Sequence, residues 1–231
     1  MKTIPSGPQT PDALLRDKAQ AVYQRLAGVY GLPGWDNATP PLDELINTIL
    51  SQNTNDRNRD LAYNNLRGHF PSWEAVRDAD TEVVIAAIRP AGLANQKGPR
   101  IQMVLQQITE ERGALDLNFL FDLPAEEAFT WLKHFKGVGP KTASIVLQFS
   151  LGKPAFPVDT HVYRVSGRIG LRPEKMSVEQ THLFLAQLFH PQQYGPAHLN
   201  LIRLGREICH ARNPQCPVCP VKELCNYYIN L

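Results

Sequence analysis

The chain has 231 residues, of which 43% are hydrophobic and 20% charged, with a formal net charge of +2; this composition excludes a disordered or fibrous protein. No run approaches the roughly 18 apolar residues of a membrane span, which excludes a membrane-spanning protein. The start, MKTIPSGPQTPDALL, lacks the apolar centre of a secretory signal. We therefore expect a cytoplasmic protein without structural disulfides.

The first half of the chain reads as helices separated by polar turns. Residues 1–9 are predicted to be a disordered leader, and Thr10 is predicted to cap a helix that ends at Gly31. A second helix starts near Pro41 and carries an apolar stripe over 42–50. Polar residues 51–56 end that helix, and the next is predicted to start near Asn55.

Helical patterns continue to the C-terminus. Short helices are predicted over 73–76 and 81–88, followed by a turn with Leu93 at its tip. Three later helices are predicted to end at Gly113, before Gly137 and at Gly152. Another is predicted to follow Asp159, and the next to run from Ser177 through Phe189. A last long helix is predicted to include Leu201, Leu204 and Ile208. No segment alternates with the period of a strand, so the sequence predicts an all-α fold.

The stretch Gly137-Val138-Gly139-Pro140-Lys141-Thr142 is predicted to be a tight turn that opens a helix. Glycine lets a backbone approach a ligand closely, and free N–H groups at a helix start attract an anion. The turn is therefore a candidate grip on a DNA phosphate, which positions DNA without reading its bases. Alone, such a turn is more often an ordinary helix–helix connection.

Lys141 and Asp159 are the candidate catalytic pair. A lysine in the first turn of a helix opposes the helix dipole, which together with partial burial favours the neutral, nucleophilic amine. Asp159 stands where a carboxylate caps the next helix, and His161 follows it and is predicted to line the same site. From 133 to 175 eight Lys/Arg against two acids give a local net charge of +6, which suits a polyanion.

The four cysteines form a second motif, because all lie in a short C-terminal stretch with the spacing C-x6-C-x2-C-x5-C. They are Cys209, Cys216, Cys219 and Cys225. Clustered cysteines in an intracellular chain favour a metal site over disulfides. The spacing alone leaves zinc and an iron–sulfur cluster open.

Together these residues resemble the endonuclease III family of DNA glycosylases, in the helix-hairpin-helix superfamily. Four landmarks fall in the family order: LSQNT at 50–54, GLANQK at 92–97, GVGPKTA with VDTHVYRV over 137–165, and the cysteine tail. The resemblance covers the chain from about Pro41 to Tyr228. It implies a [4Fe-4S] cluster on the four cysteines.

The resemblance implies two helical domains flanking a DNA-binding cleft. One is a six-helix domain over 36–154 with the helix-hairpin-helix motif; the other joins 1–35 to 155–231 and holds the cluster loop. Lys141 matches the nucleophile that attacks C1′ of the damaged nucleotide, which is flipped out of the duplex. Asp159 matches the carboxylate that activates it. The enzyme would remove oxidised pyrimidines from damaged double-stranded DNA and cleave the strand by β-elimination.

The resemblance also implies DNA contacts. Asn53, or its neighbour Gln52, matches the residue that fills the gap left by the flipped base, and Leu93 matches an apolar wedge. Arg212 matches a basic residue of the cluster loop, and Gly137, Val138, Gly139 and Thr142 match the phosphate-holding turn. We expect a monomer, nucleoid-associated if bacterial or archaeal. The alternatives are a mismatch-type uracil or thymine glycosylase on the same scaffold, or a non-catalytic DNA-binding module.

Overall fold

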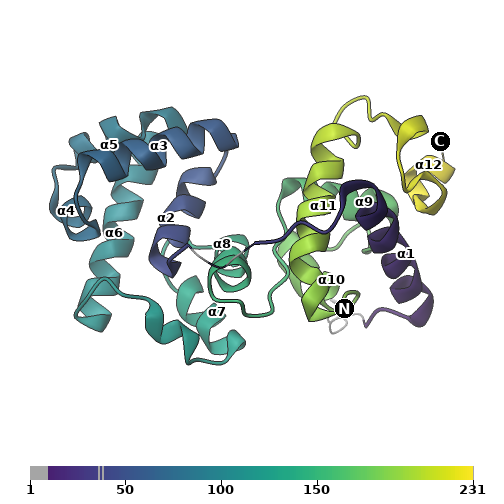
Figure 1. Ribbon diagram of the computed structural model, residues 1–231, viewed down its shortest axis with the longest axis horizontal. Coiled ribbons are helices and arrows are strands. Elements are labelled where there is room, and N and C mark those ends of the chain that lie inside the picture. The colour runs from purple at the N-terminus through teal and green to yellow at the C-terminus, as the bar shows by residue number, and fades with distance from the viewer. Residues whose placement is uncertain (1–9, 36, 38, 231) are drawn as a thin grey trace, which may run out of the picture. The chain divides into compact units, whose positions relative to one another are not determined.

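The structure is a computed structural model that describes residues 10–35, 37 and 39–230. The leader predicted over 1–9 lies outside the described residues. Helices and their connections make up the described chain, which contains no strand, so the predicted all-α class is confirmed (Figure 1). None of the described helices combines the length and the apolar character needed to cross a membrane.

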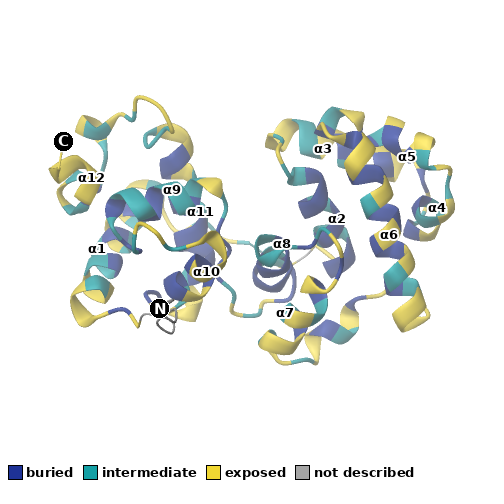
Figure 2. Ribbon diagram, turned by 180° about the vertical axis from the view of Figure 1, so that it is seen from behind, coloured by how far each residue is buried: buried dark blue, intermediate teal, exposed yellow. Residues whose placement is uncertain are grey.

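The chain divides into two compact units. One unit is continuous and comprises residues 37–153, and the other joins residues 1–36 to 154–231. Each unit has its own buried residues, which Figure 2 shows on the inward faces of its helices.

The continuous unit contains the helices α2 (Pro41–Ser51), α3 (Asp56–His69), α4 (Trp73–Asp78), α5 (Thr81–Ile88), η1 (Arg89–Ala91), α6 (Ala94–Arg112), η2 (Asn118–Phe121), α7 (Ala125–Lys133), α8 (Pro140–Ile145) and η3 (Val146–Ser150). The apolar stripe predicted for α2 is buried and packs against α3, α6 and α8. The helix predicted to start near Asn55 is α3, and Asn55 is its cap, because its side chain accepts a hydrogen bond from the Asn58 N–H.

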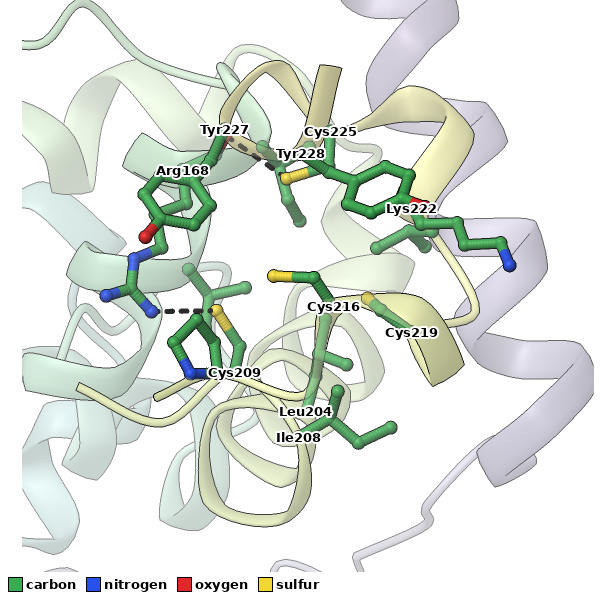
Figure 3. Close-up of a pocket in the computed structure, with 14 residues that line it drawn as sticks. Arg168, Leu204, Ile208, Cys209, Cys216, Cys219, Lys222, Cys225, Tyr227 and Tyr228 are labelled. Atoms are coloured by element: carbon green, nitrogen blue, oxygen red, sulfur yellow. Dashed lines mark hydrogen bonds between the residues drawn. The ribbon is translucent and has the colours of Figure 1, made fainter. Parts of the chain in front are cut away.

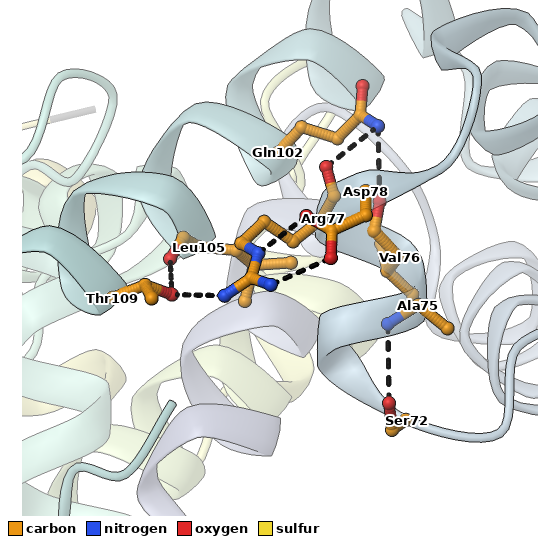
Figure 4. A network of polar contacts seen from close by, with 8 residues as sticks. All are labelled: Ser72, Ala75, Val76, Arg77, Asp78, Gln102, Leu105 and Thr109. Carbon is orange, nitrogen blue, oxygen red and sulfur yellow. Dashed lines mark hydrogen bonds and ion pairs between the residues drawn. The ribbon is translucent and has the colours of Figure 1, made fainter. Parts of the chain in front are cut away.

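Polar contacts fix the short helix α4 against α6 (Figure 4). The Gln102 amide donates to the carbonyl oxygens of Val76 and Ala79, which satisfies the open C-terminal end of α4. Arg77 donates to Thr109 Oγ1 at 2.9 Å. A six-residue helix is too short to be stable alone, so these bonds and the buried Trp73 hold it in place.

The helix that follows Lys141 differs from its prediction. Regular α-helix ends at Ile145, and the chain continues as one π-helical turn over Val146–Ser150 instead of running unchanged to Gly152. Periodicity does not reveal this widened turn, since Val146 and Leu147 are buried as an ordinary helix would bury them.

The second unit contains α1 (Ala13–Tyr30), α9 (Thr160–Ile169), α10 (Val178–Ala186), η4 (Pro191–Gln193), α11 (Tyr194–Glu207), η5 (Cys216–Val218), η6 (Lys222–Leu224) and α12 (Asn226–Ile229). The prediction that Thr10 caps α1 is wrong. Asp12 is the cap, and its carboxylate accepts from the Leu15 N–H at 2.7 Å. The capping box at Ser177 is confirmed, but α10 ends at Ala186 rather than at Phe189.

Core packing orders the second unit around α11, which packs against both α9 and α1. Val162 and Val165 of α9 and Leu201 of α11 belong to one buried cluster, and each is at most 1% exposed. Trp35, which periodicity does not place, lies against Gly195 at the start of α11; a Cβ on that glycine would come within 2.0 Å of the indole ring. The small residue therefore makes room for the ring.

Candidate functional site

The two glycines of the Gly137-Val138-Gly139 turn have different structural roles. Gly137 has φ +93°, a conformation that disfavours a side chain, and its Cβ would lie 2.3 Å from Arg100 Cδ. Gly139 has φ −90° at the start of α8, and a Cβ there would meet nothing within 4 Å. Val138 is 4% exposed and its N–H donates to Phe135 O, so it anchors the turn to the unit.

Gln52 is tied to this turn from the end of α2. Its amide Nε2 donates to Gly137 O at 3.3 Å, and its Oε1 accepts from Arg100 at 3.0 Å. Arg100 therefore packs over the glycine and holds the glutamine at the same time. The role of Arg100 was not predictable from the sequence, because a single basic residue inside a long helix carries no signal.

Lys141 lies in the first turn of α8 and is partly buried. Its charge acts on Glu44 of α2, the helix that packs against α8. Burial raises the pKa of Glu44, while a hydrogen bond from Thr48 and the charges of Arg59 and Lys141 act in the opposite direction. Glu44 does not stand out in the sequence, since an acid in the first turn of a helix usually interacts favourably with the helix dipole.

The two residues matched to base-pair opening both have left-handed backbones on exposed loops. Asn53 has φ 52° and is exposed, and Leu93 has φ 51° and is 46% exposed. Such angles are uncommon outside glycine and are typical of functional loops. Because Gln52 is engaged at the Gly137 turn, Asn53 is the better candidate for the gap-filling residue.

Asp159 caps α9, and its Oδ1 accepts from the Val162 N–H at 2.7 Å. His161, in the first turn of α9, faces α11 instead of standing free. Arg164 donates to His161 Nδ1 at 3.1 Å and to Gly205 O at 2.8 Å. The histidine is thus held beside the catalytic candidate by packing within its own unit.

The cluster loop brings the predicted cysteines together. Four thiols, those of Cys209, Cys216, Cys219 and Cys225, line one pocket with apolar residues of α9 and α11 (Figure 3). Within the described chain no three His, Cys, Asp or Glu side chains converge on a single ion. Four cysteine thiols around one pocket match the four-thiolate ligand set of an iron–sulfur cluster.

Arg168 organises this loop from α9. Its guanidinium donates to Cys209 Sγ at 3.4 Å and to the carbonyl oxygens of His210 and Ala211, and it stacks on Tyr227. Burial raises the pKa of the Cys216 and Cys219 thiols, and the neighbouring cysteines add to that shift. Iron offsets this cost because it binds the thiolate form. The residues present therefore fit an iron–sulfur cluster, while Arg212 lies exposed on the same loop.

Residues 46–191 match the HhH-GPD superfamily base excision DNA repair protein, and residues 209–225 match the iron–sulfur binding domain of endonuclease III. Endonuclease III of Thermotoga maritima is 34% identical over 82% of this chain and 84% of its own length. An Arabidopsis thaliana protein provisionally named a DNA glycosylase is 42% identical over 62% of this chain, which spans only 49% of that relative.

A solved non-covalent endonuclease III–DNA complex has the same fold, with a TM-score of 0.79 and 26% identity over 93% of this chain and 97% of that one. The family and these relatives identify the chain as an enzyme, a DNA glycosylase with AP lyase activity that binds DNA and carries an iron–sulfur cluster. The chain belongs to the HhH-GPD superfamily of base excision DNA repair proteins, in the endonuclease III branch defined by its C-terminal iron–sulfur domain.

Proposed function

We propose that the chain removes oxidised pyrimidines from duplex DNA and then cuts the strand, acting as a monomer in the cytoplasm or nucleoid. The observation that carries this proposal is Lys141 in the first turn of α8, directly after the glycine turn and within the family-matched region. A binding module needs no such amine, and a lyase does.

In the proposed reaction the neutral Lys141 amine attacks C1′ of the flipped nucleotide. The new N–C1′ bond forms as the bond to the base breaks, and the base leaves with that electron pair and takes up a proton. Opening of the sugar gives an imine, loss of a C2′ proton follows, and the 3′ phosphate departs. The carboxylate of Asp159 stabilises the positive charge that develops on the sugar.

We propose that the unit over residues 37–153 and the unit that joins 1–36 to 154–231 are two domains that both contact bound DNA. Gly139 and the N–H groups of Lys141 and Thr142 would hold a phosphate, with Gly137 and Val138 shaping the turn. Asn53 would fill the gap left by the flipped base, Leu93 would wedge into the opposite strand, and His161 and Arg212 would contact the backbone. The [4Fe-4S] cluster would hold the loop that carries Arg212.

Oligonucleotides carrying thymine glycol, a uracil or thymine mismatch, or an abasic site test this proposal. Excision of thymine glycol followed by strand cleavage is the expected result. Cleavage confined to the mismatched substrates would favour the alternative mismatch glycosylase. Binding without base release on any substrate would contradict the proposed reaction.

A further inference from the structure

Lys97 is a buried cation that the proposed reaction does not use. It is 1% exposed, one of the largest fully buried side chains of the described chain, and it is the fourth residue of α6. Burial of a lysine is costly unless its ammonium is hydrogen-bonded. The desolvation of this ammonium costs free energy, so its burial needs a physical explanation.

The ammonium joins two segments that are 41 residues apart in the sequence. Its Nζ donates to Leu50 O and to Ala91 O, each at 2.8 Å. Leu50 O belongs to the last turn of α2, where carbonyl oxygens lack helical partners and the helix dipole favours a cation. Ala91 O ends the short helix η1.

Each of these two carbonyl groups lies just before an exposed residue with a left-handed backbone. Asn53 follows Leu50 by three residues, and Leu93 follows Ala91 by two. A left-handed non-glycine residue persists only where its surroundings fix it. Lys97 supplies a common anchor for both loops.

We propose that Lys97 is a positioning residue for base-pair opening, whose buried ammonium fixes the spacing between the Asn53 loop and the Leu93 loop. The inference rests on the proposed roles of those two residues. Two groups that must enter one base-pair step from two loops need a fixed separation, since a displacement of about 1 Å can cost about a hundredfold in rate. Backbone acceptors suit this purpose, because the tie then does not depend on the loop side chains.

The test compares two variants of Lys97. Lys97→Met keeps the length of the side chain and removes the hydrogen-bond donors, whereas Lys97→Gln keeps an amide donor. Lys133→Met, at an exposed lysine, is the control for the loss of a charge. Borohydride trapping on a single-stranded abasic oligonucleotide counts the folded, active enzyme, because that substrate has no base pair to open. Excision from a fully paired lesion duplex, per active enzyme, then measures opening independently of any loss of folded protein. A 2-aminopurine next to the lesion reports unstacking directly.

We expect Lys97→Met to slow excision and unstacking about tenfold to a hundredfold per active enzyme, with Lys97→Gln intermediate and Lys133→Met near wild type. In a protein that already carries Asn53→Ala and Leu93→Ala, adding Lys97→Met should cost less than about twofold, because coupled residues are not additive. A fully additive loss in that background would overturn the inference. Normal excision by the Asn53→Ala, Leu93→Ala protein would overturn the loop roles, while normal wild-type trapping would leave the proposed chemistry intact.

Discussion

Two alanine substitutions, only two residues apart, should have opposite effects on stability. At Gly137 an alanine must adopt a left-handed backbone, which costs about 1–2 kcal/mol. Its Cβ would also displace Arg100 and break the 3.0 Å bond from Arg100 to Gln52, and a bond from a charged donor contributes about 1.5–3 kcal/mol. Together these contributions predict that Gly137→Ala lowers the free energy of unfolding by about 2.5–5 kcal/mol.

At Gly139 the extended backbone accepts alanine and the space is open, so Gly139→Ala should keep or raise stability by about 0.4–1 kcal/mol. If a DNA phosphate approaches Gly139, the added methyl group should weaken binding about tenfold to a hundredfold through the lost hydrogen bond. The loss should be equal on damaged and undamaged duplexes, because a phosphate contact carries no base information. The salt dependence should not change, since no charge is removed.

Urea denaturation and duplex binding at several salt concentrations measure both variants. Gly137→Ala alone does not isolate the phosphate contact, because it disturbs the Arg100–Gln52 pair as well. Gly139→Ala at wild-type affinity, or a loss confined to damaged DNA, would refute the reasoning about the turn.

Three further predictions concern the cluster, the carboxylate and the buried lysine. Anaerobically purified protein should absorb broadly at about 400 nm and contain about four irons per chain. Elemental analysis that finds one zinc and no iron would contradict the presence of the cluster. Asp159→Asn should keep the cap of α9 and the melting temperature, and it should slow base release about 10²–10³-fold in single-turnover kinetics. A lowered melting temperature that accounts for the whole loss of rate would assign Asp159 a structural role only. Burial lowers the pKa of Lys97 from 10.5 to about 8, so between these pH values the unfolded chain binds more protons than the folded chain. The free energy of unfolding of the wild type, relative to that of Lys97→Met, should therefore rise by up to about 3 kcal/mol as pH increases through that window. Urea denaturation that shows the same difference at every pH would contradict this.

The motifs in which residue type and spacing both carry meaning were predictable from the sequence. The buried stripe of α2, the helix start near Asn55, the cap at Asp159 and the capping box at Ser177 follow from local rules and are confirmed. The cysteine spacing also sufficed to predict an iron–sulfur cluster once the family resemblance was added. Local rules succeed here because a cap or an apolar stripe is encoded within a few residues of a single helix.

Residues that act across long sequence separations were not predictable. Lys97 bonds to Leu50, and Arg100 to Gln52, across more than 45 residues, so neither pair leaves a periodic or motif signal. Thr10 and Asp12 are both good capping residues, and only the observed bond to Leu15 decides between them. The π-helical turn after Ile145 leaves no signal in the periodicity of the sequence either.

The most direct test of the account is borohydride trapping by Lys141→Gln protein on an abasic-site duplex. The substitution removes the amine and keeps a side chain of similar length, so folding and DNA binding should persist. Wild-type protein should form a covalent band, because borohydride reduces the imine to a stable amine. Lys141→Gln protein, freed of host glycosylases, should form no band and should not cut the strand. A band of wild-type intensity would mean that another amine is the nucleophile and would contradict the assignment of Lys141.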